Sequence, residues 1–211
     1  MNIVLPVVLG LFLSSVGIVL PGLLNMTAAK ISLKEGRQRA LLFALGATLI
    51  IFFQTYIAVS FAKFLYRRPD IIYRLEEIGL LIFLMLTLFF FFIARKKKHK
   101  KEKEVVKPGS RTSNFFLGTL LSALNFFPIP YYVFISVSFS SYGYFYFDHL
   151  FVFLFVMGAV TGSFAVFYLY IVFFKKIEHR CDFFMRNVNY FLGAVTGLIA
   201  IITLIKIIQS H

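Results

Sequence analysis

The chain has 211 residues, of which 60% are apolar, 19% aromatic and only 15% charged, with a net charge of +13. Soluble globular domains contain about 45–50% apolar and about 25% charged residues, so this composition excludes a disordered chain, a nucleic-acid-binding domain and an ordinary soluble enzyme. The single cysteine, Cys181, excludes an internal disulfide and a multi-thiolate metal site.

Uncharged runs follow one another along the chain, and each approaches the roughly 20 apolar residues that cross a bilayer. They predict six transmembrane helices, at residues 3–29, 38–66, 72–95, 112–139, 147–174 and 185–208. The runs are continuously apolar and do not alternate, which favours helices over membrane strands. The first run has no preceding basic residue and no small-residue cleavage site, so we expect a span and not a removable signal peptide. The predicted fold is an all-α membrane protein.

The first span is interrupted late, by Pro21 and Gly22. Proline has no N–H and crowds the carbonyl one turn back, here that of Gly17. The freed backbone groups cannot be satisfied by lipid. Asn25, one turn further on, can hydrogen-bond such groups or a ligand.

The second span contains Gln54, the most polar side chain near the middle of any span. Two interpretations remain open for this residue. It either faces a cavity or forms a hydrogen bond between helices.

The fourth span repeats the interruption of the first, because Asn125 is followed by Pro128 and Pro130. Its uncharged run is too long for one straight helix, which indicates a broken helix or a re-entrant segment. Breaks at corresponding positions of two halves are typical of a transporter's binding site, and free helix N-termini suit a substrate carboxylate. The alternative is a pair of kinks that only shape helix packing. The candidate substrate-binding residues are Pro21, Gly22, Asn25, Gln54, Asn125, Pro128 and Pro130.

Short motifs recur in the same order in the two halves of the chain. The pairs are Leu9–Ser14 with Leu117–Ser122, Gly46–Thr48 with Gly158–Thr161, and Gly79 with Gly193. They predict one membrane domain with a three-helix repeat at 1–95, a basic linker at 96–111 and a second repeat at 112–211. Three is an odd number of spans, so the second repeat is inverted relative to the first.

The positive charge predicts the orientation in the membrane. Seventeen of the 22 Lys and Arg residues lie in the loops 30–39, 95–111 and 175–186, and five lie on the other side. Cytoplasmic loops are enriched in Lys and Arg, so these three loops are predicted to be cytoplasmic, resting on the lipid headgroups, and both termini external. The loop 140–147 has no Lys or Arg and is rich in Tyr and Phe, as in an outer interfacial belt.

Several kinds of site are missing from the sequence. No span carries an acidic or basic residue near its middle, so we predict that no intramembrane carboxylate carries a coupling proton. No cluster has metal-ligand spacing, and there is no catalytic triad, paired carboxylate or phosphate loop. We therefore expect no enzymatic activity, no metal and no cofactor.

Together these motifs resemble the LysE/RhtB family of amino-acid exporters. The resemblance rests on Pro21–Gly22, on the stretch Glu35–Ala40 and on Gly118–Pro128. Leu23 stands where the family has a second proline, which marks a divergent member. The resemblance implies export of amino acids or similar small zwitterionic metabolites across a bacterial inner membrane, by one repeat rocking against the other around the two breaks.

Two rival functions remain open. The first is transport of another small solute or cation, and the second is a non-transporting membrane assembly or scaffold protein. The pairs Gly158/Gly162 and Gly193/Gly197 would suit either a neighbouring helix or a partner subunit in a homo-oligomer. A midplane cavity lined by Asn25, Gln54 and Asn125 would favour transport, and a dry core would favour a scaffold.

Overall fold

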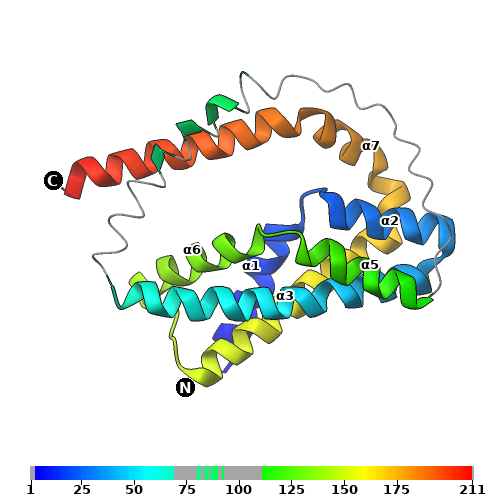
Figure 1. The fold of residues 1–211 in the computed structure, drawn as a ribbon, viewed down its shortest axis with the longest axis horizontal. Coiled ribbons are helices and arrows are strands. Elements are labelled where there is room, and N and C mark those ends of the chain that lie inside the picture. The colour runs from blue at the N-terminus through cyan, green and yellow to red at the C-terminus, as the bar shows by residue number, and fades with distance from the viewer. Residues whose placement is uncertain are drawn as a thin grey trace. The chain divides into compact units, whose positions relative to one another are not determined.

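The computed structural model describes residues 3–68, 80–81, 84–85, 87–89, 92 and 111–210, and within 175–210 the side chains of only a few. The elements in these ranges are helices (Figure 1). They are α1 (Val4–Ile18), α2 (Leu23–Glu35), α3 (Arg37–Tyr66), α5 (Arg111–Ala123), α6 (Pro128–Ser141) and α7 (His149–Ser210). The predicted all-α membrane protein is confirmed.

Four of the six predicted membrane spans coincide with candidate spans in the structure. Helix α3 and the His149–Phe174 part of α7 are each long and apolar enough to cross a bilayer. The pair α1 and α2, bent by 80°, and the pair α5 and α6, bent by 57°, each qualify as one broken span. The third predicted span, 72–95, lies largely outside the described residues, and the sixth is helical with a shorter apolar segment, Thr196–Ile205. The count of six spans stays a prediction.

The chain divides into two compact units, and each draws on both predicted repeats. Unit 1 consists of Met1–Tyr66 and Val106–Ile177. Unit 2 consists of Arg67–Val105 and Glu178–His211, so α7 contributes to both units. The two predicted breaks and the four spans above belong to unit 1, which therefore contains the candidate site.

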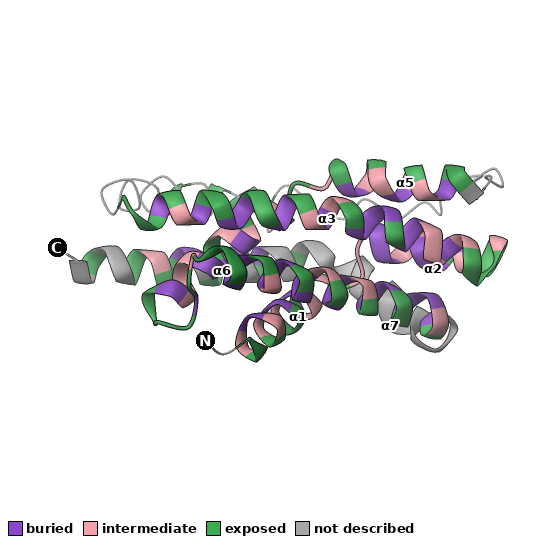
Figure 2. Cartoon of the chain, turned by 90° about the horizontal axis from the view of Figure 1, so that it is seen from below, coloured by how far each residue is buried: buried purple, intermediate pink, exposed green. Residues whose placement is uncertain are grey.

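Helix α3 buries one face and exposes the other (Figure 2). Its buried residues recur every three or four positions, the spacing of one helix face. Ala40, Ala44, Ala47 and Ala58 on the buried face have no exposed surface, and their small side chains let neighbouring helices approach closely. One core cluster joins α2, α3 and α7, and a second joins α3, α6 and α7.

Two helix crossings in unit 1 depend on glycine. A Cβ atom on Gly10 would overlap the carbonyl oxygen of Phe155 in α7, and one on Gly158 would overlap that of Val7 in α1. In each case the oxygen belongs to the residue three positions before the opposite glycine. A hydrogen bond of 2.6 Å between the hydroxyls of Ser14 and Ser163 adds to the α1–α7 contact.

The α3–α5 crossing has the same construction. A Cβ atom on Gly118 would overlap the carbonyl oxygen of Phe43, and one on Gly46 would overlap that of Phe115. Again each oxygen lies three positions before the opposite glycine. Because the motif pairs equate Gly10 with Gly118 and Gly46 with Gly158, the two crossings are the same contact with the halves exchanged. The internal repeat itself stays a prediction.

Two of the predicted cytoplasmic loops differ from the structure. Within 30–39 only Gly36 is outside a helix, because its φ of +94° lets a single glycine join α2 to α3. The predicted loop 175–186 is helical and part of α7. Between Gly162 and Gly193 the sequence has no Gly or Pro that would end a helix, and charge alone does not interrupt one. The loop 95–111 lies almost entirely outside the described residues.

The turn between α6 and α7 carries the aromatic residues predicted to form an outer belt. Tyr142, Tyr144 and Tyr146 are each more than half exposed, whereas Phe145 is buried, with its ring centroid 4.9 Å from that of Phe151. Asp148 begins α7 by accepting a hydrogen bond from the Phe151 N–H at 3.0 Å, as an N-cap residue does. The tyrosines are therefore free to meet an interface while Phe145 holds the turn to the core.

Fewer side-chain contacts are described in unit 2 than in unit 1. The hydroxyls of Thr87 and Thr196 lie 3.0 Å apart, and a Cβ atom on Gly197 would come within 3.3 Å of the Thr87 methyl group. Two segments far apart in the sequence are thus neighbours in this unit.

Candidate functional site

The first helix break lies between α1 and α2. Helix α1 ends at Ile18, because Pro21 cannot donate the hydrogen bond that would continue it. Gly22 is extended, with φ −131° and ψ −179°, and α2 then begins at Leu23 in a new direction. The break leaves backbone carbonyls at the end of α1 that lipid could not satisfy.

Asn25 satisfies two of these carbonyls. Its side-chain Nδ2 donates to the carbonyl oxygens of Ile18, at 2.6 Å, and Leu20, at 2.9 Å. The residue is only 3% exposed, and its Oδ1 atom has no hydrogen-bond partner among the residues that the structure describes. Asn25 therefore holds the first break in shape and keeps an unused acceptor beside it.

The second break, between α5 and α6, is held in the same way by a residue from another helix. Gln54 of α3 donates through Nε2 to the carbonyl oxygens of Ser122, at 3.1 Å, and Asn125, at 2.9 Å. The Ser122 carbonyl also accepts from the Asn125 N–H at 3.1 Å. Gln54 is 6% exposed, and within the described part of the chain its Oε1 has no hydrogen-bond partner. At each break, one carboxamide group binds two carbonyls.

The start of α6 differs chemically from the start of α2. Pro128 and Pro130 remove two of its first N–H donors, and the Asn125 Oδ1 accepts from the Phe127 N–H at 3.3 Å. Helix α2 has no proline in its first turn, and its N-cap, Gly22, supplies no side-chain hydrogen bond. The donors at the start of α2 are therefore available, whereas those of α6 are largely removed or used.

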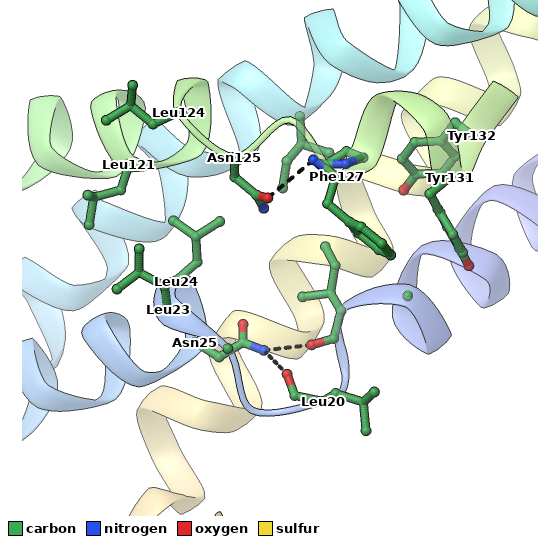
Figure 3. A pocket seen from close by; sticks show the side chains of 15 residues that line it. Leu20, Leu23, Leu24, Asn25, Leu121, Leu124, Asn125, Phe127, Tyr131 and Tyr132 are labelled. Atoms are coloured by element: carbon green, nitrogen blue, oxygen red, sulfur yellow. Dashed lines mark hydrogen bonds between the residues drawn. The ribbon is translucent and has the colours of Figure 1, made fainter. Parts of the chain in front are cut away.

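Both breaks open onto one cavity of about 400 Å³ (Figure 3). Asn25 and Asn125 point toward each other from its two sides. The lining comes from the end of α1, the start of α2, one residue of α3, the end of α5 and the start of α6. The lining residues are Gly17, Ile18, Leu20, Gly22, Leu23, Leu24, Asn25, Ile51, Leu121, Leu124, Asn125, Phe127, Pro128, Tyr131 and Tyr132.

The structure brings together four of the seven residues predicted from the sequence. Gly22, Asn25, Asn125 and Pro128 line the cavity. The other three, Pro21, Gln54 and Pro130, belong to the breaks or hold them without lining the cavity. Of the two interpretations left open for Gln54, the structure has the hydrogen bond between helices.

Aromatic residues and one glycine complete the cavity, and the sequence prediction missed them. Tyr131 stacks on Phe127 with ring centroids 6.1 Å apart, and its hydroxyl donates to the Leu13 carbonyl of α1 at 2.6 Å. A Cβ atom on Gly17 would come within 2.9 Å of the Tyr131 ring, so this ring reaches α1 because Gly17 has no side chain. The signal that could have found the aromatic residues is their position immediately around Pro128 and Pro130.

A buried carboxylate outside the cavity was also missed. The Glu35 side chain, at the end of α2, is 4% exposed. Its Oε2 accepts from Arg39 of α3 at 3.1 Å and from Asn114 of α5 at 2.9 Å. Glu35 thus ties three helices together at the end opposite the Tyr-rich turn, and it lies within the Glu35–Ala40 motif that carries the family resemblance.

Among the described residues, no group of three or more His, Cys, Asp or Glu is placed to hold a metal ion. The cavity itself is lined by apolar and aromatic side chains, two carboxamides and backbone. Such a lining can bind and orient a small molecule by hydrogen bonds and shape.

A family model described as "LysE type translocator" matches residues 15–206, which is most of the chain. Comparison with curated proteins gave no match, and comparison with solved structures gave none either.

Proposed function

The chain belongs to the LysE type translocator family, and from this premise we propose that it exports amino acids or related small zwitterionic metabolites across a bacterial cytoplasmic membrane. Membership makes it a multi-pass membrane protein and a transporter of amino-acid-like substrates. The observation that carries the narrower proposal is the meeting of two held-open helix breaks at one cavity. A transporter binds its substrate at such breaks, where backbone groups are free to pair with it.

The glycine crossings indicate which elements move together during transport. They join α1 to α7 and α3 to α5, with backbone in contact with backbone. Sliding within either pair would bring helices into steric conflict. We therefore expect alternating access to move the α1–α7 pair against the α3–α5 pair, with the cavity between them. In this mechanism neither sequence half moves as a block.

The rival functions are less well supported by the cavity. A scaffold protein has no need of a 400 Å³ opening at two broken helices. Transport of a small inorganic cation usually requires carboxylates or a cage of oxygen ligands, and none of the residues lining this cavity is acidic. A small zwitterion can bind to the groups that the lining has, which are carboxamides and backbone hydrogen-bonding groups.

We expect Asn125→Ala to lose export while keeping most of its stability. The side chain is half-buried and satisfies a single N–H, that of Phe127, so its loss costs about 1 kcal/mol of folding free energy. Its backbone carbonyl, which Gln54 holds, remains. The measurement is efflux of a panel of amino acids from cells lacking their own exporters, beside the protein's thermal unfolding midpoint in detergent. A variant that exports at the native rate would make Asn125 a packing residue only.

The charge bias also carries a prediction about orientation. A reporter fused after His211 is expected on the outer side of the membrane, and one inserted near Lys101 in the cytoplasm, because 17 of the 22 basic residues lie in the stretches 30–39, 95–111 and 175–186. The measurement uses two reporter enzymes at each fusion point, one active only outside the membrane and one active only in the cytoplasm. The reverse pattern would overturn the predicted external termini and the predicted cytoplasmic side of the basic stretches.

A further inference from the structure

The cavity has no charged side chain in its lining. The residues that line it are mostly leucine, isoleucine and aromatic residues, together with Asn25 and Asn125 (Figure 3). A charged group moved from water into such surroundings without a partner is strongly disfavoured. A substrate that is charged on its side chain would therefore bind here with a large loss of hydration and no compensating ion pair.

The start of α2 offers the cavity free hydrogen-bond donors. Leu23 and Leu24 are the first two residues of a 13-residue helix, so their N–H groups have no partner within it. Gly22, which also lines the cavity, provides no side-chain cap. The positive end of the helix dipole lies at the same place. A carboxylate is the group that such an end binds best.

Asn25 supplies a second, independent feature beside these donors. Its Oδ1 is a hydrogen-bond acceptor with no partner in the described ranges, on a residue that is 97% buried and lines the cavity. In Figure 3 this oxygen is turned away from the two carbonyls that Nδ2 binds and toward the Asn125 side of the cavity. A buried acceptor in this state is satisfied when a donor reaches it. An ammonium group next to a carboxylate on α2 would be such a donor.

We propose that the cavity selects neutral amino acids with an apolar side chain, the carboxylate binding the N–H groups of Leu23 and Leu24 and the ammonium binding Asn25 Oδ1. The side chain then lies against Leu121, Leu124 and the Phe127 and Tyr131 rings. The start of α6 is a poor site for the carboxylate, because Pro128 and Pro130 have no N–H and the Phe127 and Ile129 N–H groups already have partners. This inference rests on the proposed function and names the substrate class of the same site.

The substrate class is tested by competition in proteoliposomes that contain the full chain and exchange radiolabelled leucine. Norleucine and lysine have the same four-carbon side chain, and lysine adds a terminal ammonium. Norleucine is expected to compete about as well as leucine, and lysine roughly 100-fold more weakly. Leucinamide, which lacks the carboxylate, is also expected to compete weakly.

The carboxylate contact is tested by a change to one backbone N–H. Leu23→Pro removes that donor at the first helical position, where proline is tolerated, after a Gly22 that already has the extended conformation proline requires. The side chain of Leu23 is 67% exposed. Leu23→Ala shortens the side chain and keeps the N–H. The preference for leucine over leucinamide is expected to fall at least about tenfold in the proline variant and to persist in the alanine variant.

The outcomes separate this inference from the function on which it rests. If lysine exchanges as well as norleucine, or better, the substrate class is wrong and amino-acid transport stands. If leucine and leucinamide are discriminated equally in both Leu23 variants, the carboxylate does not bind α2. If no amino acid exchanges at all, although the protein is folded by its unfolding midpoint, the proposed function fails and the substrate class with it. The unfolding midpoint of each Leu23 variant serves as its control for folding.

Discussion

Replacing Gly118 with alanine is expected to leave little folded protein in the membrane. The added Cβ would overlap the carbonyl oxygen of Phe43 and come within 3.1 Å of the Ala47 N atom, both backbone atoms of α3. Backbone cannot rotate away as a side chain can, so α5 would have to move off α3 along their contact. Overpacking costs about 1–3 kcal/mol where side chains can adjust, and we expect a larger loss here.

The measurement for Gly118→Ala is the yield of monodisperse protein and its thermal unfolding midpoint in detergent. Gly22→Ala is the matched control for stability, because its Cβ would have no neighbour closer than 3.9 Å and its backbone is compatible with any residue. The Gly22→Ala control is expected to have nearly the same thermal unfolding midpoint as the unchanged protein. Equal midpoints for the two variants would mean that α3 and α5 are not packed backbone to backbone.

Asn25→Leu is expected to destabilise the first break more than any other single loss of a polar side chain in unit 1. The leucine is close in size but donates nothing, so the Ile18 and Leu20 carbonyls lose their side-chain donor. An unsatisfied buried carbonyl costs about 1–3 kcal/mol, which the loss of the unpaired Oδ1 offsets only in part. Since α1 and α2 both line the cavity, export should fail in the same variant.

Two further variants on α3 make this prediction a graded series. Gln54→Leu should reduce the free energy of unfolding less than Asn25→Leu does. The Ser122 carbonyl still accepts from the Asn125 N–H, and only the Asn125 carbonyl loses its side-chain donor. Thr48→Val should be nearly neutral, because its hydroxyl only adds to the Ala44 and Leu45 carbonyls within its own helix. Thermal unfolding of the three proteins gives the order. A midpoint for Asn25→Leu equal to that of Thr48→Val would contradict the role of Asn25 as a brace.

Proline made the breaks predictable from the sequence. Pro21 and Pro128 act through covalent structure, since each lacks an N–H whatever surrounds it. The helices accordingly stop at Ile18 and Ala123 and resume at Leu23 and Pro128. The recurrence of the motifs around them allowed the two breaks to be paired before any coordinates.

Contacts between distant residues were not predictable in the same way. Gln54 lies 68 residues before Ser122, and nothing near Gln54 in the sequence reveals which carbonyl it binds. Glu35 reads as a loop residue among lysines and arginines, yet packing of α2 against α3 and α5 buries it beside Asn114. The cluster of charges at 175–186 predicts a loop, yet α7 continues through it, because Lys, Arg and Glu are good helix formers.

If the two halves correspond as predicted, the reciprocal glycine crossings have the contact pattern of a symmetric dimer. In a two-fold dimer, if residue i of one subunit contacts residue j of the other, then j of the first contacts i of the second, and the interface is isologous. Gly10 against the backbone before Gly158, and Gly118 against the backbone before Gly46, follow that rule under the predicted correspondence of the halves. The basic linker at 96–111 then acts as a covalent fusion of two partners that already complement each other. Residues 1–95 expressed alone would present Gly10 and Gly46 surfaces that complement each other, and a second copy inserted in the opposite orientation would satisfy both.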